Sequence, residues 1–153
     1  MQTEEFLKKI KARDASKLKV SIVASRFHSD ITDPMVEGAL GTLKEWKVKD
    51  KNITVRRVYG SFDLSFAAAR AIKKDKPHAV IAIGCIVKGE TRHDEYIANA
   101  VFKGLTDLSI QHVIPVSLGV LTVNDLAQAK VRSSGATNHG EKAAVAALEA
   151  ALS

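Results

Sequence analysis

The stretch from Gly84 to His93 combines an anion-binding type of loop with a side chain that can move protons. It follows the apolar run 79–83 and precedes a helical pattern. A buried strand that breaks at glycine and restarts as a helix directs free backbone N–H groups toward one point, which suits a negatively charged ligand. His93 lies in the first turn of that helix, where an imidazole can exchange protons near neutral pH. The pattern therefore predicts a reaction centre.

Within this stretch the carboxylate of Glu90 is an unusual neighbour for an anion. We expect the backbone N–H groups of Glu90 and Thr91 to bind, with the Glu90 side chain in solvent. Thr91 and Asp94 have the spacing of a capping box, which would form without any ligand. Lys88 and Arg132 would complete a phosphate cradle if the fold brings them together.

Two aromatic residues follow other predicted strands. Phe27 comes after the first strand, where it either lies at the rim of a site or simply closes the core. Phe62 belongs to the run Gly60-Ser61-Phe62-Asp63 after the second strand, and Asp63 is placed to cap the next helix.

Other reactive residue types give weaker signals. Cys85 is the only cysteine, which excludes an internal disulfide and a four-thiolate zinc site and indicates a reducing compartment. At a strand end it is more typical of a small buried side chain than of a nucleophile. His139 lies in a turn-rich loop, where polar residues are common. Metal-ligand spacing, a G-x-G-x-x-G motif and a Walker loop are all absent from the sequence, so we expect neither a metal nor a cofactor.

Strands and helices alternate along the chain, which predicts a three-layer α/β/α sandwich with a four-stranded parallel sheet, flavodoxin-like in class. Ligands of such sheets lie beyond the carboxyl ends of the strands. We also expect residues 118–122 to lie at this edge of the sheet. A helix is expected to begin at Asp33-Pro34, as N-cap and first helical residue. The expected strands cover 18–25, 52–59, 78–87 and 112–122, and the expected helices start near 33 and cover 64–72, 96–108, 124–132 and 141–152.

Composition narrows the function classes. The 153 residues fit one domain, with residues 1–17 as a polar arm that orders against another subunit and 18–153 as the folded part. The net charge of +6 is scattered and aromatics are few, so we expect no nucleic-acid partner. We also expect no membrane segment and, because the N-terminus lacks a signal pattern, a cytoplasmic location.

In order along the chain, these fragments resemble the 6,7-dimethyl-8-ribityllumazine synthase family of riboflavin biosynthesis. The resemblance covers about Leu18 to Ala150. It rests on Val23–Phe27 before Ile31-Thr32, Glu37–Ala39, Gly60–Asp63, Ile83–His93, Pro115-Val116 with Gly119–Thr122, Gln128-Ala129 ahead of Arg132, and Asn138–Gly140.

The resemblance implies a transferase that condenses 5-amino-6-(D-ribitylamino)uracil with 3,4-dihydroxy-2-butanone 4-phosphate and releases phosphate and water, without a cofactor. It implies that His93 shuttles protons and that Phe27 stacks on the pyrimidine. The remaining residues that it implies are Ser61, Phe62 and Asp63 on the ribityl side, backbone groups of Cys85, Ile86 and Val87 at the pyrimidine edge, Leu118 on one pocket wall, and Gly89, Glu90, Thr91, Arg132 and His139 at the phosphate.

The sequence departs from the family pattern at a few of these positions. Leu118 replaces a usual phenylalanine, Asp63 a commoner glutamate and His139 a usual lysine, as in fungal relatives. The loop after Arg132 is one residue shorter than the common bacterial form. The sequence motif Gly-Glu-Thr-x-His-Asp-Glu is similar to that of archaeal members.

The family also implies an assembly, either a homopentamer or a 60-subunit icosahedral capsid, with each pocket shared between neighbours. A different reading of the same fold is a catalytically weak lumazine- or flavin-binding or shell-forming protein. A generic flavodoxin-like nucleotide binder would need glycines after the first strand, and Ser25–His28 lacks them.

Overall fold

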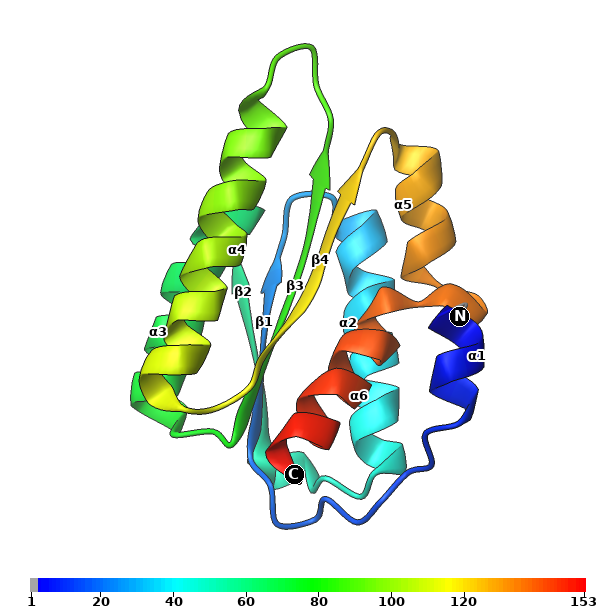
Figure 1. The fold of residues 1–153 in the computed structure, drawn as a ribbon, viewed down its shortest axis with the longest axis vertical. Helices are drawn as coiled ribbons and strands as arrows, with labels where there is room; N and C mark the ends of the chain where they lie inside the picture. The colour runs from blue at the N-terminus through cyan, green and yellow to red at the C-terminus, as the bar shows by residue number, and fades with distance from the viewer. Residues whose placement is uncertain (1–2) are drawn as a thin grey trace.

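The computed structural model describes residues 3–153, and within that range the chain forms one parallel sheet (Figure 1). Its strands are β1 (Val20–Ser25), β2 (Ile53–Val58), β3 (Ala79–Val87) and β4 (Val116–Val123), in the order β2-β1-β3-β4. The four-stranded parallel sheet expected for residues 18–153 is confirmed over this described range.

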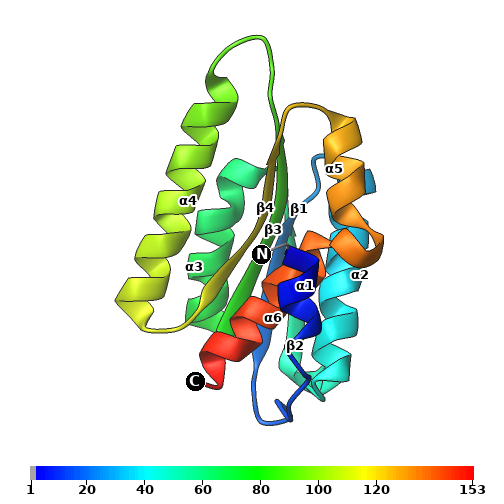
Figure 2. The same cartoon turned by 45° about the vertical axis from the view of Figure 1, so that its right-hand side comes forward.

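Helices cover both faces of the sheet, which confirms the predicted three layers. Figures 1 and 2 show α3 (Leu64–Asp75) and α4 (His93–His112) on one face. The other face carries α2 (Ser29–Glu45), α5 (Leu126–Ser133) and α6 (His139–Ala151). Short 3₁₀ turns, η1 (Asp50–Asn52), η2 (Ser61–Asp63) and η3 (Gly135–Thr137), connect the elements. Over residues 3–153 we find no helix that is both long and apolar enough to span a membrane.

The side chains of the central strands alternate between two hydrophobic clusters. Ile22 and Ile81 point toward α2 and α6, whereas Val23 and Val80 point toward α3 and α4. Strand β3 is covered on both faces, as its apolar sequence predicts. The register places Cys85 beside Leu121 and Val87 beside Val123, so the ends of β3 and β4 share one edge.

Helix α2 begins earlier than predicted. Asp33 is not its N-cap and Pro34 is not its first residue, because the helix starts at Ser29 and Pro34 lies inside it. Ile31 and Thr32 explain the difference. Both are fully buried, and the Thr32 hydroxyl donates to the Ser25 carbonyl at 2.8 Å, so tertiary packing outweighs the local signal of proline.

The polar arm is ordered against its own chain. Helix α1 (Thr3–Lys8) precedes an extended segment, and Phe6, Leu7 and Ile10 line a shallow apolar groove with residues of α6. Ala15 is buried, and its N–H donates to the Trp46 carbonyl at 2.7 Å. Residues 3–8 thus form a helix within this chain, whereas the sequence predicted an arm that orders against another subunit; residues 1 and 2 lie outside the described range.

Candidate active site

A cavity of about 590 Å³ opens at the carboxyl edge of the sheet. Its volume is in the range of small-molecule sites. The turn after β1, the η2 turn, the end of β3 and the first turn of α4 all contribute to its wall. The lining residues are Phe27, His28, Tyr59, Gly60, Ser61, Phe62, Asp63, Cys85, Ile86, Val87, Gly89, Thr91, His93, Asp94 and Ile97.

Exposed aromatic rings form one side of this cavity. Phe27 is 57% exposed, Tyr59 79% and Phe62 65%. The ring centroids of Phe27 and Tyr59 are 6.4 Å apart with an interplanar angle of 26°, and the Phe27 N–H donates to the Tyr59 carbonyl at 2.9 Å. Phe27 therefore does not close the core. Large aromatic surface left open to solvent is typical of a binding site, here one that suits a flat ring.

The turn that presents Phe27 is conformationally strained. His28 adopts the left-handed conformation, with φ 60° and ψ 49°, which non-glycine residues adopt infrequently. Its carbonyl accepts hydrogen bonds from Ile31 and Thr32 at the start of α2, and its ring lies 4.4 Å from that of Phe27. The start of α2 thus holds the Phe27 ring at the rim.

The η2 turn forms another part of the cavity wall. The Asp63 carboxylate accepts the Gly60 N–H at 3.1 Å, and the Ser61 hydroxyl donates weakly to the Cys85 carbonyl at 3.4 Å. Asp63 occupies the N-cap position of α3, as predicted, but its side chain makes no cap hydrogen bond to that helix. Its carboxylate closes the η2 turn on itself instead.

The loop between β3 and α4 offers unpaired donors. Among the residues that the structure describes, no acceptor is found for the backbone N–H groups of Gly89, Glu90, Thr91 or Arg92. They precede a helix of 20 residues, whose macrodipole favours negative charge at this end. The Glu90 side chain is exposed and does not line the cavity, so it leaves the donors free.

His93 is the first residue of α4 and lines the cavity. The Thr91 hydroxyl oxygen accepts the His93 N–H at 3.3 Å. The predicted capping box between Thr91 and Asp94 is wrong, because no side chain caps α4 in this way. Asp94 lines the cavity instead, where its carboxylate adds negative charge next to His93.

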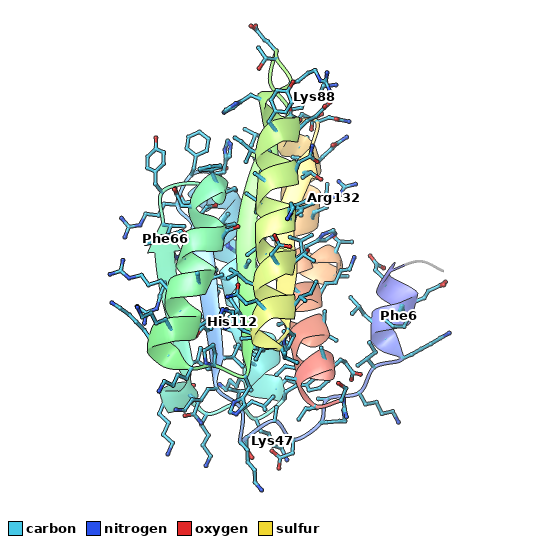
Figure 3. All side chains as sticks on the ribbon, turned by 60° about the vertical axis from the view of Figure 1, so that its left-hand side comes forward. Phe6, Lys47, Phe66, Lys88, His112 and Arg132 are labelled. Atoms are coloured by element: carbon cyan, nitrogen blue, oxygen red, sulfur yellow. The ribbon has the colours of Figure 1, made fainter. Side chains whose placement is uncertain are left out.

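Besides Glu90, three predicted site residues do not reach this cavity. Leu118 pairs with Ala82 in mid-strand, so its inclusion in the carboxyl rim is corrected. Arg132 lies on α5 and His139 at the start of α6, on the face opposite α4 (Figure 2). Figure 3 shows Lys88 at the top of the molecule and Arg132 lower down, so the predicted cradle of these two cations does not form within one chain.

Arg132 and His139 belong to a separate basic group. The pKa of His139 is lowered, chiefly by burial and further by the positive charges of Lys142 and Arg132. The Arg132 guanidinium donates to the Gln128 carbonyl at 3.0 Å, which holds it along α5. The lowered pKa favours the neutral form of His139, so Arg132 and Lys142 supply the positive charge of this group.

Sequence reasoning missed His28, Tyr59, Asp94 and Ile97 as cavity residues. The first two adjoin predicted site residues along the chain, and Asp94 and Ile97 follow His93 within about one helical turn. A search of the neighbours of each rim residue would have found them. The thiol of Cys85 is buried, and burial raises its pKa to about 11, so its backbone and not its sulfur is available for chemistry.

No cluster of three or more histidine, cysteine, aspartate or glutamate side chains suited to a metal ion occurs among residues 3–153. The residues that line the cavity are hydrogen-bonding groups, aromatic rings and the aliphatic residues Ile86, Val87 and Ile97.

Comparisons with known proteins agree with one another. The family model described as 6,7-dimethyl-8-ribityllumazine synthase matches residues 17–153. Curated relatives with that name include one from Phocaeicola vulgatus, which is 42% identical over 137 residues, covering 89% of this chain and 82% of the relative. A relative from Parabacteroides distasonis is 39% identical, and the match covers 89% of this chain and 86% of the relative. A relative from Porphyromonas gingivalis is 41% identical, and the match covers 88% of this chain and 84% of the relative.

Proposed function

The chain belongs to the 6,7-dimethyl-8-ribityllumazine synthase family, and on this premise we propose how its side chains divide the work of the reaction. It is a transferase of riboflavin biosynthesis. It condenses 5-amino-6-(D-ribitylamino)uracil with 3,4-dihydroxy-2-butanone 4-phosphate to 6,7-dimethyl-8-ribityllumazine and releases phosphate and water.

The observation that carries the site assignment is the cavity at the carboxyl edge of the sheet. It gathers an exposed aromatic wall, a row of unpaired N–H groups and His93. Phe27 stacks on the pyrimidine ring of the uracil substrate. The η2 turn, with Ser61, Phe62 and Asp63, holds the ribityl chain, because its hydroxyl and carboxylate suit a polyol. Backbone groups of Cys85, Ile86 and Val87 bind the pyrimidine edge.

The phosphate of the second substrate binds at the start of α4. Backbone N–H groups of Gly89, Glu90 and Thr91 supply donors, and the helix macrodipole adds favourable charge. A phosphate that carries nearly two negative charges also calls for a cation. Arg132 is the candidate, because a guanidinium matches phosphate oxygens with paired donors. His139 adds a neutral donor or acceptor beside it.

The chemistry needs positioning and proton transfer. The amine of the uracil attacks the ketone, water leaves as an imine forms, phosphate is eliminated, and the ring closes with loss of a second water. Stacking one substrate beside a fixed phosphate makes this an intramolecular encounter. His93 gives and takes the protons, a contribution of about 10²- to 10⁴-fold.

Arg132, His139 and Leu118 lie away from the cavity of their own chain, so we assign them to the cavity of a neighbouring subunit. Leu118 is 48% exposed on the edge strand β4, as expected of a side chain that awaits a partner surface. A contact between unlike surfaces closes into a ring when its rotation allows. We propose the ring that the family resemblance implies, a homopentamer, alone or built into a 60-subunit capsid.

Light scattering with gel filtration over a dilution series, coupled to product absorbance, tests this assignment. Activity should fall as the assembly dissociates. An active monomer of 16.5 kDa would show that the site is complete in one chain.

For the domain and the compartment we make two further assignments. Residues 18–153 form the synthase domain, and residues 1–17 form an N-terminal arm, of which Phe6, Leu7 and Ile10 pack on α6; the family match that begins at residue 17 supports this division. The cytoplasm is the compartment, because a chain whose only cysteine is a buried free thiol suits reducing conditions.

A further inference from the structure

Gly84 lies in the interior of β3, where a glycine weakens a sheet and needs a reason. Backbone conformation is not that reason, because the only described glycine with a positive φ is Gly135. Gly84 is buried and pairs with Val120 across the sheet, as any residue there would. The reason must therefore be space on one face of the strand.

The space beside Gly84 is filled by the start of the η2 turn and of α3. A Cβ atom at position 84 would lie 2.6 Å from the Ser61 hydroxyl oxygen and 2.9 Å from Leu64 Cδ1. It would lie 3.4 Å from the Ser61 Cβ, which is an ordinary contact. Both side chains are buried, but the Ser61 contact is the shorter one and involves a side chain held in a short turn, whereas the Leu64 contact involves the end of a longer side chain. The Ser61 hydroxyl is thus the main obstacle to a side chain at 84.

Hydrogen bonds tie the residues of the η2 turn together, so this contact affects more than Ser61. The Asp63 N–H donates to the Gly60 carbonyl at 3.1 Å, and the Asp63 carboxylate accepts the Gly60 N–H at 3.1 Å. Phe62, between them, has its ring 65% exposed beside the cavity. Any outward shift of Ser61 therefore carries Phe62 and Asp63 away from the cavity.

We propose that Gly84 is a positioning residue for the uracil substrate: its missing side chain sets how deeply the η2 turn sits at the cavity wall. Gly84 itself touches no substrate in this scheme. The inference rests on the assignment of the η2 turn to the ribityl chain in the proposed function.

The test measures KM for each substrate in Gly84→Ala. Because a displacement of about 1 Å can cost up to about 100-fold, we expect the KM for the uracil to rise about 10-fold or more. The KM for the butanone phosphate should change less than about twofold, since its donors lie on a separate loop. Gly41→Ala is the matched control, because a Cβ there has no atom within 4 Å. Its kinetics should equal those of the wild type.

A double-mutant cycle tests the route through Ser61. Ser61→Ala removes the hydroxyl that lies 2.6 Å from the added Cβ. In that background Gly84→Ala should change the uracil KM less than about twofold, so the two substitutions are not additive. If Gly84→Ala does not fold, a folded Ser61→Ala/Gly84→Ala protein supports the inference, and an unfolded one overturns it.

Phe62→Ala separates this inference from the function on which it rests. An unchanged uracil KM in Phe62→Ala would contradict the assignment of the η2 turn to the uracil. A raised uracil KM in Phe62→Ala, with an unchanged one in Gly84→Ala, would overturn the role of Gly84 alone. Equal rises of both substrates' KM in Gly84→Ala would overturn it as well.

Discussion

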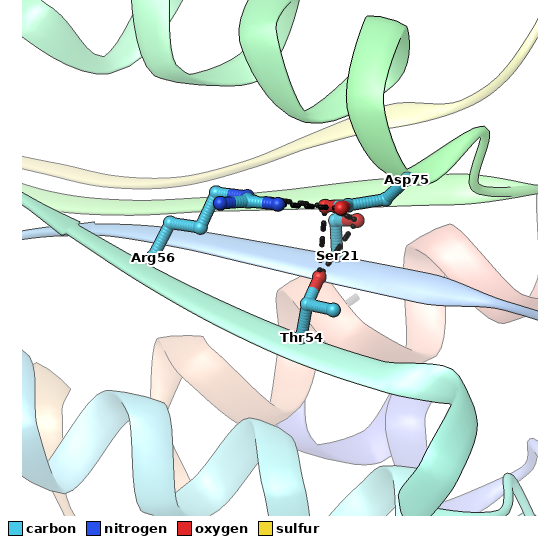
Figure 4. Close-up of polar contacts among 4 residues, drawn as sticks. All are labelled: Ser21, Thr54, Arg56 and Asp75. Atoms are coloured by element: carbon cyan, nitrogen blue, oxygen red, sulfur yellow. Dashed lines mark hydrogen bonds and ion pairs between the residues drawn. The ribbon is translucent and has the colours of Figure 1, made fainter.

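The two ends of the parallel sheet differ in whether their polar groups are hydrogen-bonded within the described chain. Near the amino end, the Asp75 carboxylate accepts hydrogen bonds from the hydroxyls of Ser21 and Thr54, each at 3.1 Å, and from the Arg56 guanidinium (Figure 4). At the carboxyl end, the N–H groups of the loop before α4 have no acceptor in the described chain, and aromatic rings face an open cavity.

This difference separates stability from function. A satisfied polar network fixes two strands and a helix to one another, and breaking it costs folding free energy. Unsatisfied donors at the other end contribute little to folding and are available to a ligand. Substitutions at the carboxyl end should therefore change kinetics at nearly constant stability, and those at the amino end the reverse.

The largest effect is expected for His93→Ala. Without its acid–base group, kcat should fall about 10²- to 10⁴-fold, while proximity of the substrates preserves some rate. Product absorbance gives the rate, and a melting curve should show no loss of stability. His112→Ala, at the far end of the same helix, is the matched control and should keep the wild-type kcat. An unchanged kcat in His93→Ala would leave His93 without a catalytic role.

Arg132→Ala should raise the KM for the butanone phosphate about 10- to 100-fold, and the KM for the uracil far less, because only the former carries the phosphate. Arg132→Lys should lie between, since an ammonium reproduces the paired donors poorly. Lys130→Ala, exposed on the same helix, controls for general loss of positive charge. Equal changes in both KM values would refute the phosphate assignment.

Asp75→Asn should lower the free energy of unfolding by about 1–3 kcal/mol and leave kcat unchanged. Each kcal/mol lost should lower Tm by about 2–4 °C. The pKa of Asp75 is lowered, chiefly by the hydrogen bond from Arg56. The Asp75 carboxylate therefore makes its whole contribution to folding stability at pH values above the unfolded pKa of about 3.9. This contribution is lost as the pH falls through the lower native pKa.

The stability difference between wild type and Asp75→Asn should accordingly shrink in acid. Asp107→Asn is the control, because its ion pair with Lys103 is exposed and should contribute less than about 1 kcal/mol. A constant difference between pH 7 and pH 3 would mean that the charge of Asp75 plays no part.

The smallest effect concerns Cys85, which lies at the functional end yet is buried. Its thiol, with a pKa raised to about 11, should not react with Ellman's reagent at pH 7.5 in the native protein. One thiol per chain should react after denaturation. Rapid native labelling would show that this end of the sheet opens.

Local sequence signals predicted the elements and one half of the site. Apolar runs ending in glycine or an aromatic residue located Phe27, Phe62 and the loop before His93 at one edge, because parallel strands end together. The start of α2 was mispredicted where buried Ile31 outweighed a local proline signal. Local sequence patterns predict the type of each element better than they predict contacts between residues that are far apart in the chain.

The network of Asp75 and the positions of Leu118 and Arg132 depend on such distant contacts. Asp75 meets Ser21 across 54 residues, and neither residue has a distinctive neighbourhood in the sequence. Arg132 was grouped with the anion loop by its charge and by the family resemblance, although the sheet separates α5 from α4. A sequence gives the chemistry of such residues, whereas their partners follow only from the fold and the assembly.

The separation of His93 and Arg132 by the sheet has a genetic consequence. If each site combines His93 of one subunit with Arg132 of the next, two defective alleles can complement each other. Random co-assembly of equal amounts of His93→Ala and Arg132→Ala chains would give about a quarter of the sites both native residues. A diploid or co-expressing cell that carries both alleles would then make riboflavin when neither allele alone suffices.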